Sequence, residues 1–423
     1  MFDRPRNDKT QIAVLDIGAS KVACFVARID DGGVLPAQAE IIGVGYHGAP
    51  AALNRARTID QWELGVRRAV DAAERMAGVR VRHVSVALPG PSVRARKIGV
   101  DIGIMGGVVT EEDLDDSLAE GARAVAAHDC ASLHATLVSS RIDGEEIPGD
   151  PVGLVGSSLS IEMLGLSAKQ SLIDNLRALL ERCGLVCDEF VAAPYAAAEA
   201  TLIEDEKDLG VAVIDIGAGS TGYAVYDDGV MIDCGGAPVG GGHVTKDIAQ
   251  IFGASFADAE RVKTIHGAAL IGLGDEHRLI DLPEAGAEET MSRASRADLC
   301  EVIIPRLEEI FELVSERLPD DQLGRSGLRR AVITGGGSLL VGAREVGERV
   351  LGMKCRLGQP QALSGAPETA SAPSFAVCAG LIQNFLKTDS ELKSTLGLSH
   401  QSPHSLTNKS VFGGVEAWLR AKF

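Results

Sequence analysis

The chain has 423 residues, of which 45% are hydrophobic and 24% charged, and a net charge of −18. This length allows two or more domains with sizeable cores. The acidic charge argues against a nucleic-acid partner, because non-specific binding needs patches of Lys and Arg that neutralise phosphates. The N-terminus is polar and no long apolar run follows, so we expect neither a signal peptide nor a transmembrane helix. The scattered cysteines favour free thiols in a reducing cytosol over a zinc site.

The first predicted element is a strand, a tight turn and a strand at residues 12–26, and its pattern recurs at residues 211–226. Both copies place Asp-Ile-Gly after an apolar run, followed by small and hydroxyl residues. A single copy would more often be an ordinary turn. Two such hairpins that face each other can clamp one polyphosphate, because glycines admit close backbone approach and N–H and hydroxyl groups donate to phosphate oxygens. The residues expected to serve the phosphates are Asp16, Gly18, Ser20, Lys21, Asp215, Gly217, Gly219, Ser220 and Thr221. Asp16 and Asp215 also lie where a Mg²⁺, held through its waters, would bridge to the phosphates.

Between the two hairpins the sequence predicts an inserted αβ subdomain. Before this subdomain the sequence predicts a strand at 41–46 and a helix that begins with a capping box at Thr58 and Gln61 and ends at Gly78. Strands at 95–104 and 134–142, a helix from 110 to about 127 and a Pro/Gly cluster at 148–153 then differ in character from their surroundings. We interpret residues 83–165 as a small domain spliced into the first half of the chain.

Two later segments carry groups suited to a nucleoside. Glu260 and Lys263 are three residues apart on a predicted helix, so they share one face and can hydrogen-bond ribose hydroxyls and a base edge. An ordinary exposed ion pair is the alternative. A short apolar strand at 331–334 runs into Gly335, Gly336 and Gly337, whose backbone can pack flat against a purine and ribose. A flexible turn between a strand and a helix is the alternative there.

The end of the chain changes composition. Residues 375–385 are predicted as the last helix of the body, and residues 387–408 form a polar linker that we expect to be flexible. In residues 409–423 the apolar side chains fall on one helical face beside basic residues, which suits a membrane surface; docking on the body or on a partner groove is the alternative. Glycines at 413–414 weaken this helix, so one tail should bind weakly and assembly should raise its avidity. The residues expected at the membrane are Val411, Phe412, Val415, Trp418, Leu419, Arg420, Lys422 and Phe423.

These four nucleotide-type segments, in this order, resemble the actin/Hsp70/sugar-kinase superfamily. The insertion and the amphipathic tail narrow the resemblance to the FtsA family of bacterial cell-division proteins, over essentially the whole chain. The resemblance implies an α/β, actin-like, two-lobed ATPase fold with an αβ subdomain inserted in the first lobe and a C-terminal amphipathic helix on a flexible linker. It implies ATP and Mg²⁺ between the lobes, with Glu260, Lys263 and Gly335 to Gly337 serving the nucleoside.

The resemblance also implies partners and a location. They are filaments of the chain itself, the tubulin-like FtsZ, other cell-division proteins, and anionic lipid at the cytoplasmic face of the inner membrane at the division septum. The implied FtsZ contact lies in residues 244–330. The expected subdomains are 1A (1–82, 166–209 and 375–386), 1C (83–165), 2A (210–243 and 331–374), 2B (244–330), the linker (387–408) and the membrane helix (409–423).

Two other functions remain open from the residues alone. One is a soluble small-molecule kinase of the same superfamily, and the other is an actin-like adaptor of a pilus or secretion system. A kinase needs a carboxylate base near the transferred phosphate, yet Glu199, Glu204 and Asp205 stand in no recognisable motif. No catalytic base can be chosen, and ATP hydrolysis stays open.

Overall fold

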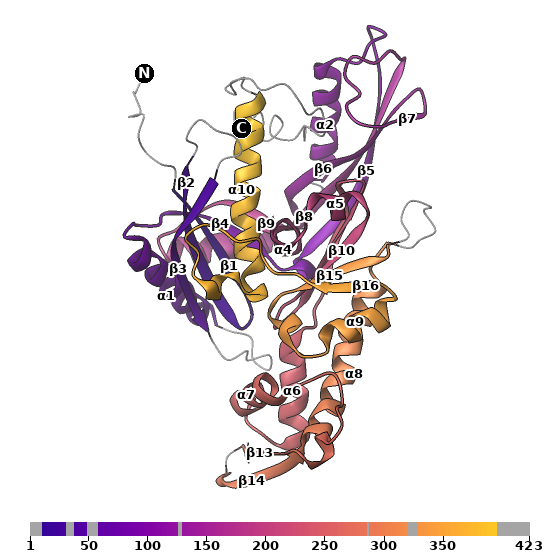
Figure 1. Ribbon diagram of the computed structural model, residues 1–423. Coiled ribbons are helices and arrows are strands. Elements are labelled where there is room, and N and C mark those ends of the chain that lie inside the picture. The colour runs from indigo at the N-terminus through magenta and orange to yellow at the C-terminus, as the bar shows by residue number, and fades with distance from the viewer. Residues whose placement is uncertain are drawn as a thin grey trace.

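The computed structural model describes residues 11–30, 38–48, 58–125, 129–285, 287–319 and 328–395. Two five-stranded sheets lie side by side, with a four-stranded sheet at one end of the molecule and a subdomain of helices and a hairpin at the other (Figure 1). This arrangement confirms the predicted α/β, two-lobed fold. The predicted membrane helix and the linker from residue 396 onward lie outside the described residues. Within the described ranges, no helix combines the length and apolar character needed to cross a bilayer.

The first sheet holds both strands of the first predicted hairpin. Its order is β3-β2-β1-β4-β9, in which β1 to β3 are antiparallel and β4 and β9 run parallel to β1. Helix α1 covers one face and starts at the predicted capping box of Thr58 and Gln61. A Cβ at Gly43 or Gly45 would overlap backbone atoms of α1, so these glycines let the helix lie close to β3. The elements are β1 (Gln11–Ile17), β2 (Lys21–Asp30), β3 (Gln38–Gly48), α1 (Ile59–Ala77), β4 (His83–Leu88), α3 (Gln170–Arg182) and β9 (Val186–Ala192).

The second sheet repeats the first. Its order is β12-β11-β10-β15-β16, again antiparallel at one side and parallel at the other. In the first hairpin Asp16 pairs with Ala23 and in the second Asp215 pairs with Gly222, so the two turns have the same length. The predicted duplication of strand, turn and strand is therefore confirmed. The elements are β10 (Val211–Ile216), β11 (Thr221–Asp227), β12 (Val230–Ala237), β15 (Arg330–Thr334), α9 (Ala343–Leu351) and β16 (Lys354–Leu357).

The inserted subdomain is a four-stranded sheet, β5-β8-β6-β7, packed against α2. The predicted limits of 83 and 165 need correction at both ends. Strand β4 belongs to the first sheet, because Val84, Val86 and Leu88 are fully buried in its core. Strand β8 continues to residue 169, because its last residues still pair with β5 and β6. The elements are β5 (Val93–Gly103), α2 (Glu111–Val125), β6 (Cys130–Ile142), β7 (Glu145–Ile147) and β8 (Ser158–Lys169).

At the opposite end of the molecule, the described part of residues 244–330 contains three α-helices. The polar stretch near 273–290 contains β13 and the start of β14, which pair as a hairpin. Ile280 and Leu282 are buried, which fixes one face of this hairpin to the core. The elements are α6 (Gly241–Phe252), α7 (Phe256–His266), β13 (Leu279–Glu284), β14 (Ala287–Ser295) and α8 (Arg296–Ser315).

The last described helix, α10 (Ala376–Thr395), is longer than predicted. It crosses α4 (Ala193–Thr201) so closely that a Cβ at Gly380 would overlap the backbone of Ala196. Residues 387–395, predicted as linker, are helical. The helix still has a tertiary partner there, because Lys387 forms an ion pair with the buried carboxylate of Glu199. The composition of this stretch is polar, and composition alone does not show that contact.

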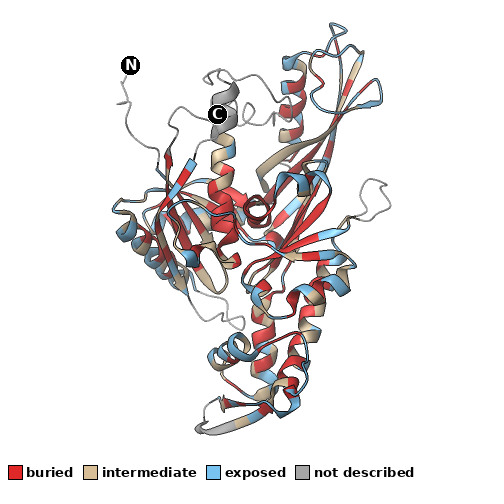
Figure 2. Ribbon diagram, in the orientation of Figure 1, coloured by how far each residue is buried: buried red, intermediate tan, exposed pale blue. Residues whose placement is uncertain are grey.

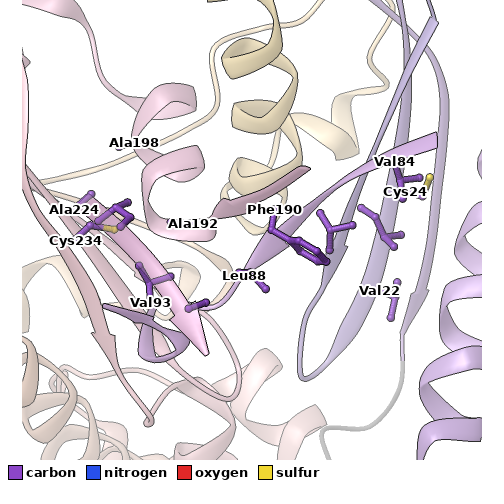
Figure 3. Packing of buried hydrophobic residues seen from close by; sticks show 14 of the residues in the cluster. Val22, Cys24, Val84, Leu88, Val93, Phe190, Ala192, Ala198, Ala224 and Cys234 are labelled. Carbon is purple, nitrogen blue, oxygen red and sulfur yellow. The ribbon is translucent and has the colours of Figure 1, made fainter. Parts of the chain in front are cut away.

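One buried cluster runs through both lobes. It includes Val22, Val84 and Leu88 on the side of the first sheet and Ala224 and Cys234 on the side of the second (Figure 3). Buried residues line the sheets and the helix faces that meet them, while the outer faces are exposed (Figure 2). The two lobes therefore share a core and are not independent domains.

Candidate functional site

The turns of the two hairpins are built in the same way. The Gly18 N–H donates to the carbonyl of Lys21, and the Gly217 N–H donates to the carbonyl of Ser220, each at 2.9 Å. A Cβ at either glycine would lie 3.1 or 2.9 Å from the same carbonyl oxygen, so both turns are tight. A shared turn geometry after a shared Asp-Ile-Gly sequence gives the molecule two equivalent loops.

The two hairpins come together through their charged side chains. Burial, together with the nearby Asp16 carboxylate, raises the pKa of Asp215 to about 7. Burial also raises the pKa of Asp16, and the Lys21 ammonium opposes both shifts. Burial lowers the pKa of Lys21, and the negative charges of the two aspartates oppose this shift only in part. The charges of Asp16, Lys21 and Asp215 thus influence one another, which brings one end of the first hairpin near the second.

This carboxylate pair fits a divalent cation. Two neighbouring carboxylates repel each other, and a metal ion placed between them removes that repulsion. Mg²⁺ is commonly held by one or two carboxylates plus phosphates and water. In the part of the chain that the structure describes, no group of three or more His, Cys, Asp or Glu side chains gathers as a protein-only metal site. Asp16 and Asp215 therefore suit Mg²⁺ that completes its shell with phosphate and water oxygens.

The three glycines after β15 differ in what surrounds them. A Cβ at Gly335 (φ +83°) would overlap the Asp215 carboxylate, and one at Gly337 would overlap Ile216. At these two positions only glycine fits, because the second hairpin packs against them. From the sequence alone, all three glycines are instead explained by the close approach of a purine and ribose. At Gly336, which is exposed, a Cβ would meet only Cβ of Ser374, at 3.7 Å, an ordinary van der Waals contact. Of the three, Gly336 is the one at which a ligand can approach.

Glu260 and Lys263 form the predicted pair on α7. The Lys263 ammonium lies 2.8 Å from the Glu260 carboxylate, and it also donates to the Gly241 carbonyl at 3.0 Å and to the Thr245 hydroxyl at 2.7 Å. Since Gly241 and Thr245 lie in the first turns of α6, the pair is tied to the start of that helix. The N–H of Gly241 in turn donates to the Gly217 carbonyl at 2.9 Å. Glu260 and Lys263 are therefore connected to the second hairpin through α6.

The hydroxyl residues of the turns occupy two kinds of position. Ser20 and Ser220, like Gly219, are half-buried within their turns. Thr221 is fully buried, and its hydroxyl donates to the carbonyl of Val239 at 2.8 Å. The buried Thr221 hydroxyl therefore stabilises the turn through Val239, although the sequence placed Thr221 among the phosphate contacts.

Two parts of the site have no counterpart in the residues chosen from the sequence. The first is the glycine run at 240–242, where a Cβ on Gly240 would overlap the Gly217 carbonyl; three adjacent glycines before a helix are a visible signal for it. The second is the short turn of Ser374 and Phe375, just before α10, which touches Lys21 on one side and Gly336 on the other. The sequence predicts Phe375 only as the first residue of the last helix, 375–385, and no motif identifies this turn as part of a site.

Comparison with known proteins shows one family. The model of the family described as "Cell division protein FtsA" matches residues 212–380. The chain is 32% identical to the cell division protein FtsA of Rhizobium meliloti (strain 1021) over 421 residues, which covers 97% of this chain and 95% of that one. It is 30% identical to that of Escherichia coli (strain K12) over 425 residues, covering 98% and 96% of the two chains.

Among solved structures, the similarity concerns the fold. A PilM–PilN type IV pilus biogenesis complex gives a TM-score of 0.62 at 18% identity, covering 90% of this chain and 99% of the other. MreB5 of Spiroplasma citri bound to ADP gives 0.51 at 15% identity, covering 91% and 98%. The fold of this chain is thus shared with actin-like proteins whose sequences differ widely.

Proposed function

Because the chain belongs to the FtsA family of cell-division proteins, we propose that it is an ATP-binding, actin-like protein that assembles into filaments and tethers FtsZ filaments to the membrane. The tether would act at the cytoplasmic face of the inner membrane, at the division septum. The observation that carries the proposal is the meeting of Asp16, Lys21 and Asp215 between two equivalent hairpins. A polyphosphate with Mg²⁺ is the ligand that such a charge arrangement serves.

In this proposal each part of the cleft has a separate role. Asp16 and Asp215 would hold Mg²⁺ through its waters, and the Lys21 ammonium would pair with phosphate charge. Backbone N–H groups of the two turns donate to phosphate oxygens. Gly336 leaves room for the nucleoside, and Glu260 and Lys263 offer an acceptor and a donor for ribose and base. Lys21 of the first hairpin and Asp215 of the second would then both contact one Mg·ATP, so that one ligand would be held by both lobes.

FtsZ is expected to bind on subdomain 2B. A groove of about 600 Å³ lies between α6 and α8 and is lined by Ile251, Phe252 and Val302 with charged residues among them. Arg306 on α8 pairs with Asp247 on α6 at 2.6 Å, which ties the two walls together. A groove between two helices that combines apolar side chains with several charged ones is suited to a short amphipathic segment of a partner.

The FtsZ site is tested by a matched pair of substitutions. Ile251, in the groove, and Ile265, on α7 outside the groove lining, are exposed to the same extent, 62% and 63%. Ile251→Glu should weaken FtsZ binding at least about tenfold, whereas Ile265→Glu should leave it unchanged. Equal losses, or no loss in the groove variant, would place the FtsZ contact elsewhere.

Nucleotide binding is tested by calorimetric titration of the full chain with ATP in the presence and absence of Mg²⁺. We expect saturable binding that weakens without the metal and weakens further in Lys21→Met, which keeps the length of the side chain but removes its charge. An ATP affinity that changes neither on removal of Mg²⁺ nor in Lys21→Met would refute the proposed site. Transfer of the γ-phosphate to a small molecule, without binding to vesicles, would instead support the soluble kinase.

A further inference from the structure

Lys21, on the first hairpin, is held by two contacts. Its ammonium lies 3.5 Å from the centre of the Phe375 ring, over the face of that ring, and it donates a hydrogen bond to the carbonyl of Ser374. A cation over an aromatic face is attracted by the negative charge of the π system, most strongly where water is excluded. Phe375 is only 9% exposed, so the contact is largely shielded from solvent.

The ring itself is held in place by two others. Phe25 on β2 lies 5.6 Å from Phe375 between ring centres, at an interplanar angle of 34°. Tyr46 on β3 lies 6.0 Å away with its ring at 64°, an edge-on arrangement. Aromatic pairs in such tilted geometries stabilise one another beyond their buried area. The face that Phe375 presents to Lys21 is therefore fixed by the first sheet and not by the lysine.

The turn that carries Phe375 also spans the two lobes. Ser374 approaches Gly336, the exposed glycine after β15, while Phe375 and the Ser374 carbonyl hold Lys21 of the first hairpin. Helix α10 starts at the next residue, Ala376. One short turn thus connects a glycine at the proposed nucleoside position with a cation at the proposed phosphate position.

We propose that Phe375 is a positioning residue for the nucleotide phosphates: its ring holds the Lys21 ammonium at the phosphate end of the cleft. The inference rests on the proposed nucleotide binding and adds a residue that no motif marks. Because Phe375 would act only through Lys21, its contribution should grow with the number of phosphates on the ligand and should vanish when the lysine has no charge.

The experiment compares ATP, ADP and adenosine binding to full-length Phe375→Leu with binding to the unchanged protein. Leucine keeps an apolar side chain but removes the aromatic face. We expect about a fivefold loss of ATP affinity, a smaller loss for ADP and less than about a twofold change for adenosine. Phe375→Tyr should restore the ATP affinity. Phe385→Leu, the same change in a half-buried ring further along α10, is the matched control and should alter none of the three affinities.

A double-mutant cycle makes the test decisive. In a Lys21→Met background, Phe375→Leu should cause no further loss of ATP affinity, because the charge on which the ring acts is gone. An equal loss for all three ligands, or a loss that persists without the lysine charge, would overturn the inference and leave Phe375 a packing residue. If Phe375→Leu does not fold, Phe375→Met takes its place, since an unbranched apolar chain adapts to irregular space. If the unchanged protein binds no ATP, the proposed function itself is refuted, and this result is distinct from a failure of the inference about Phe375.

Discussion

Replacing Asp215 by asparagine should stabilise the protein at neutral pH while weakening Mg·ATP binding. The pKa of Asp215 rises from the ordinary 3.8 to about 7, because the carboxyl is buried and lies near Asp16. A carboxyl with a raised folded-state pKa stabilises the fold below its unfolded pKa, and this contribution is lost as the pH rises towards 7. The difference between these two pKa values corresponds to about 4 kcal/mol. The side chain is only half-buried, so solvent reduces the figure to about 1–3 kcal/mol.

The assay is urea unfolding of the metal-free and nucleotide-free protein at about pH 5 and about pH 8. The free energy of unfolding of Asp215→Asn should exceed that of the unchanged protein by about 1–3 kcal/mol at the higher pH. The difference should be smaller at the lower pH. Asp71→Asn, which alters an exposed carboxylate on α1, is the control and should shift stability by no more than about 0.5 kcal/mol at either pH. If Asp215→Asn is less stable at both values, or if its gain does not depend on pH, the two aspartates do not share the charged site described above.

Five further substitutions test separate parts of the molecule. Gly336→Asp should abolish ATP binding with little loss of stability. Gly335→Ala should lower the midpoint of thermal unfolding, because Gly335 has a φ of +83° and an added Cβ would overlap the Asp215 carboxylate. Glu199→Ala should cost about 3 kcal/mol in urea unfolding, because it leaves the buried Lys207 ammonium paired only with the exposed Glu204 carboxylate. Glu204→Ala, at a side chain 76% exposed, should cost less than about 1 kcal/mol because Lys207 keeps its buried partner Glu199. Trp418→Glu should abolish vesicle binding and leave ATP affinity unchanged; loss of both would mean that the tail packs on the body.

The repeat in the sequence predicts more of this molecule than any other feature. Asp-Ile-Gly after an apolar strand is a local pattern, because the turn is closed by the Gly18 or Gly217 N–H within four residues. The pairing of β1 with β2 and of β10 with β11 follows directly. The capping box at Thr58 is local in the same sense, and it too is where the sequence placed it. Elements whose determinants lie within a few residues of each other can be predicted from one sequence.

The errors concern contacts between distant segments. The polar composition of residues 387–395 indicates a linker, but a partner almost two hundred residues earlier, Glu199, holds the start of this stretch in a helix. Strand β4 resembles the strands of the insertion, and only its parallel pairing with β1 assigns it to the first sheet. Phe375 gains its place beside Lys21 from packing against Phe25, on a strand at the other end of the chain. None of these pairings leaves a periodic pattern or a motif.

The proposed tether is tested most directly by sedimentation with anionic vesicles, with and without Mg·ATP. The full chain is compared with a chain that ends at Asn408 and with the full chain carrying Lys21→Met, and FtsZ is then added to each. We expect the full chain to sediment, to do so more strongly with Mg·ATP because assembled tails bind with higher avidity, and to carry FtsZ with it. The shortened chain should remain in solution, and the Lys21 variant should show no response to ATP. Equal sedimentation of the full and shortened chains, or of neither, would contradict a nucleotide-responsive membrane tether.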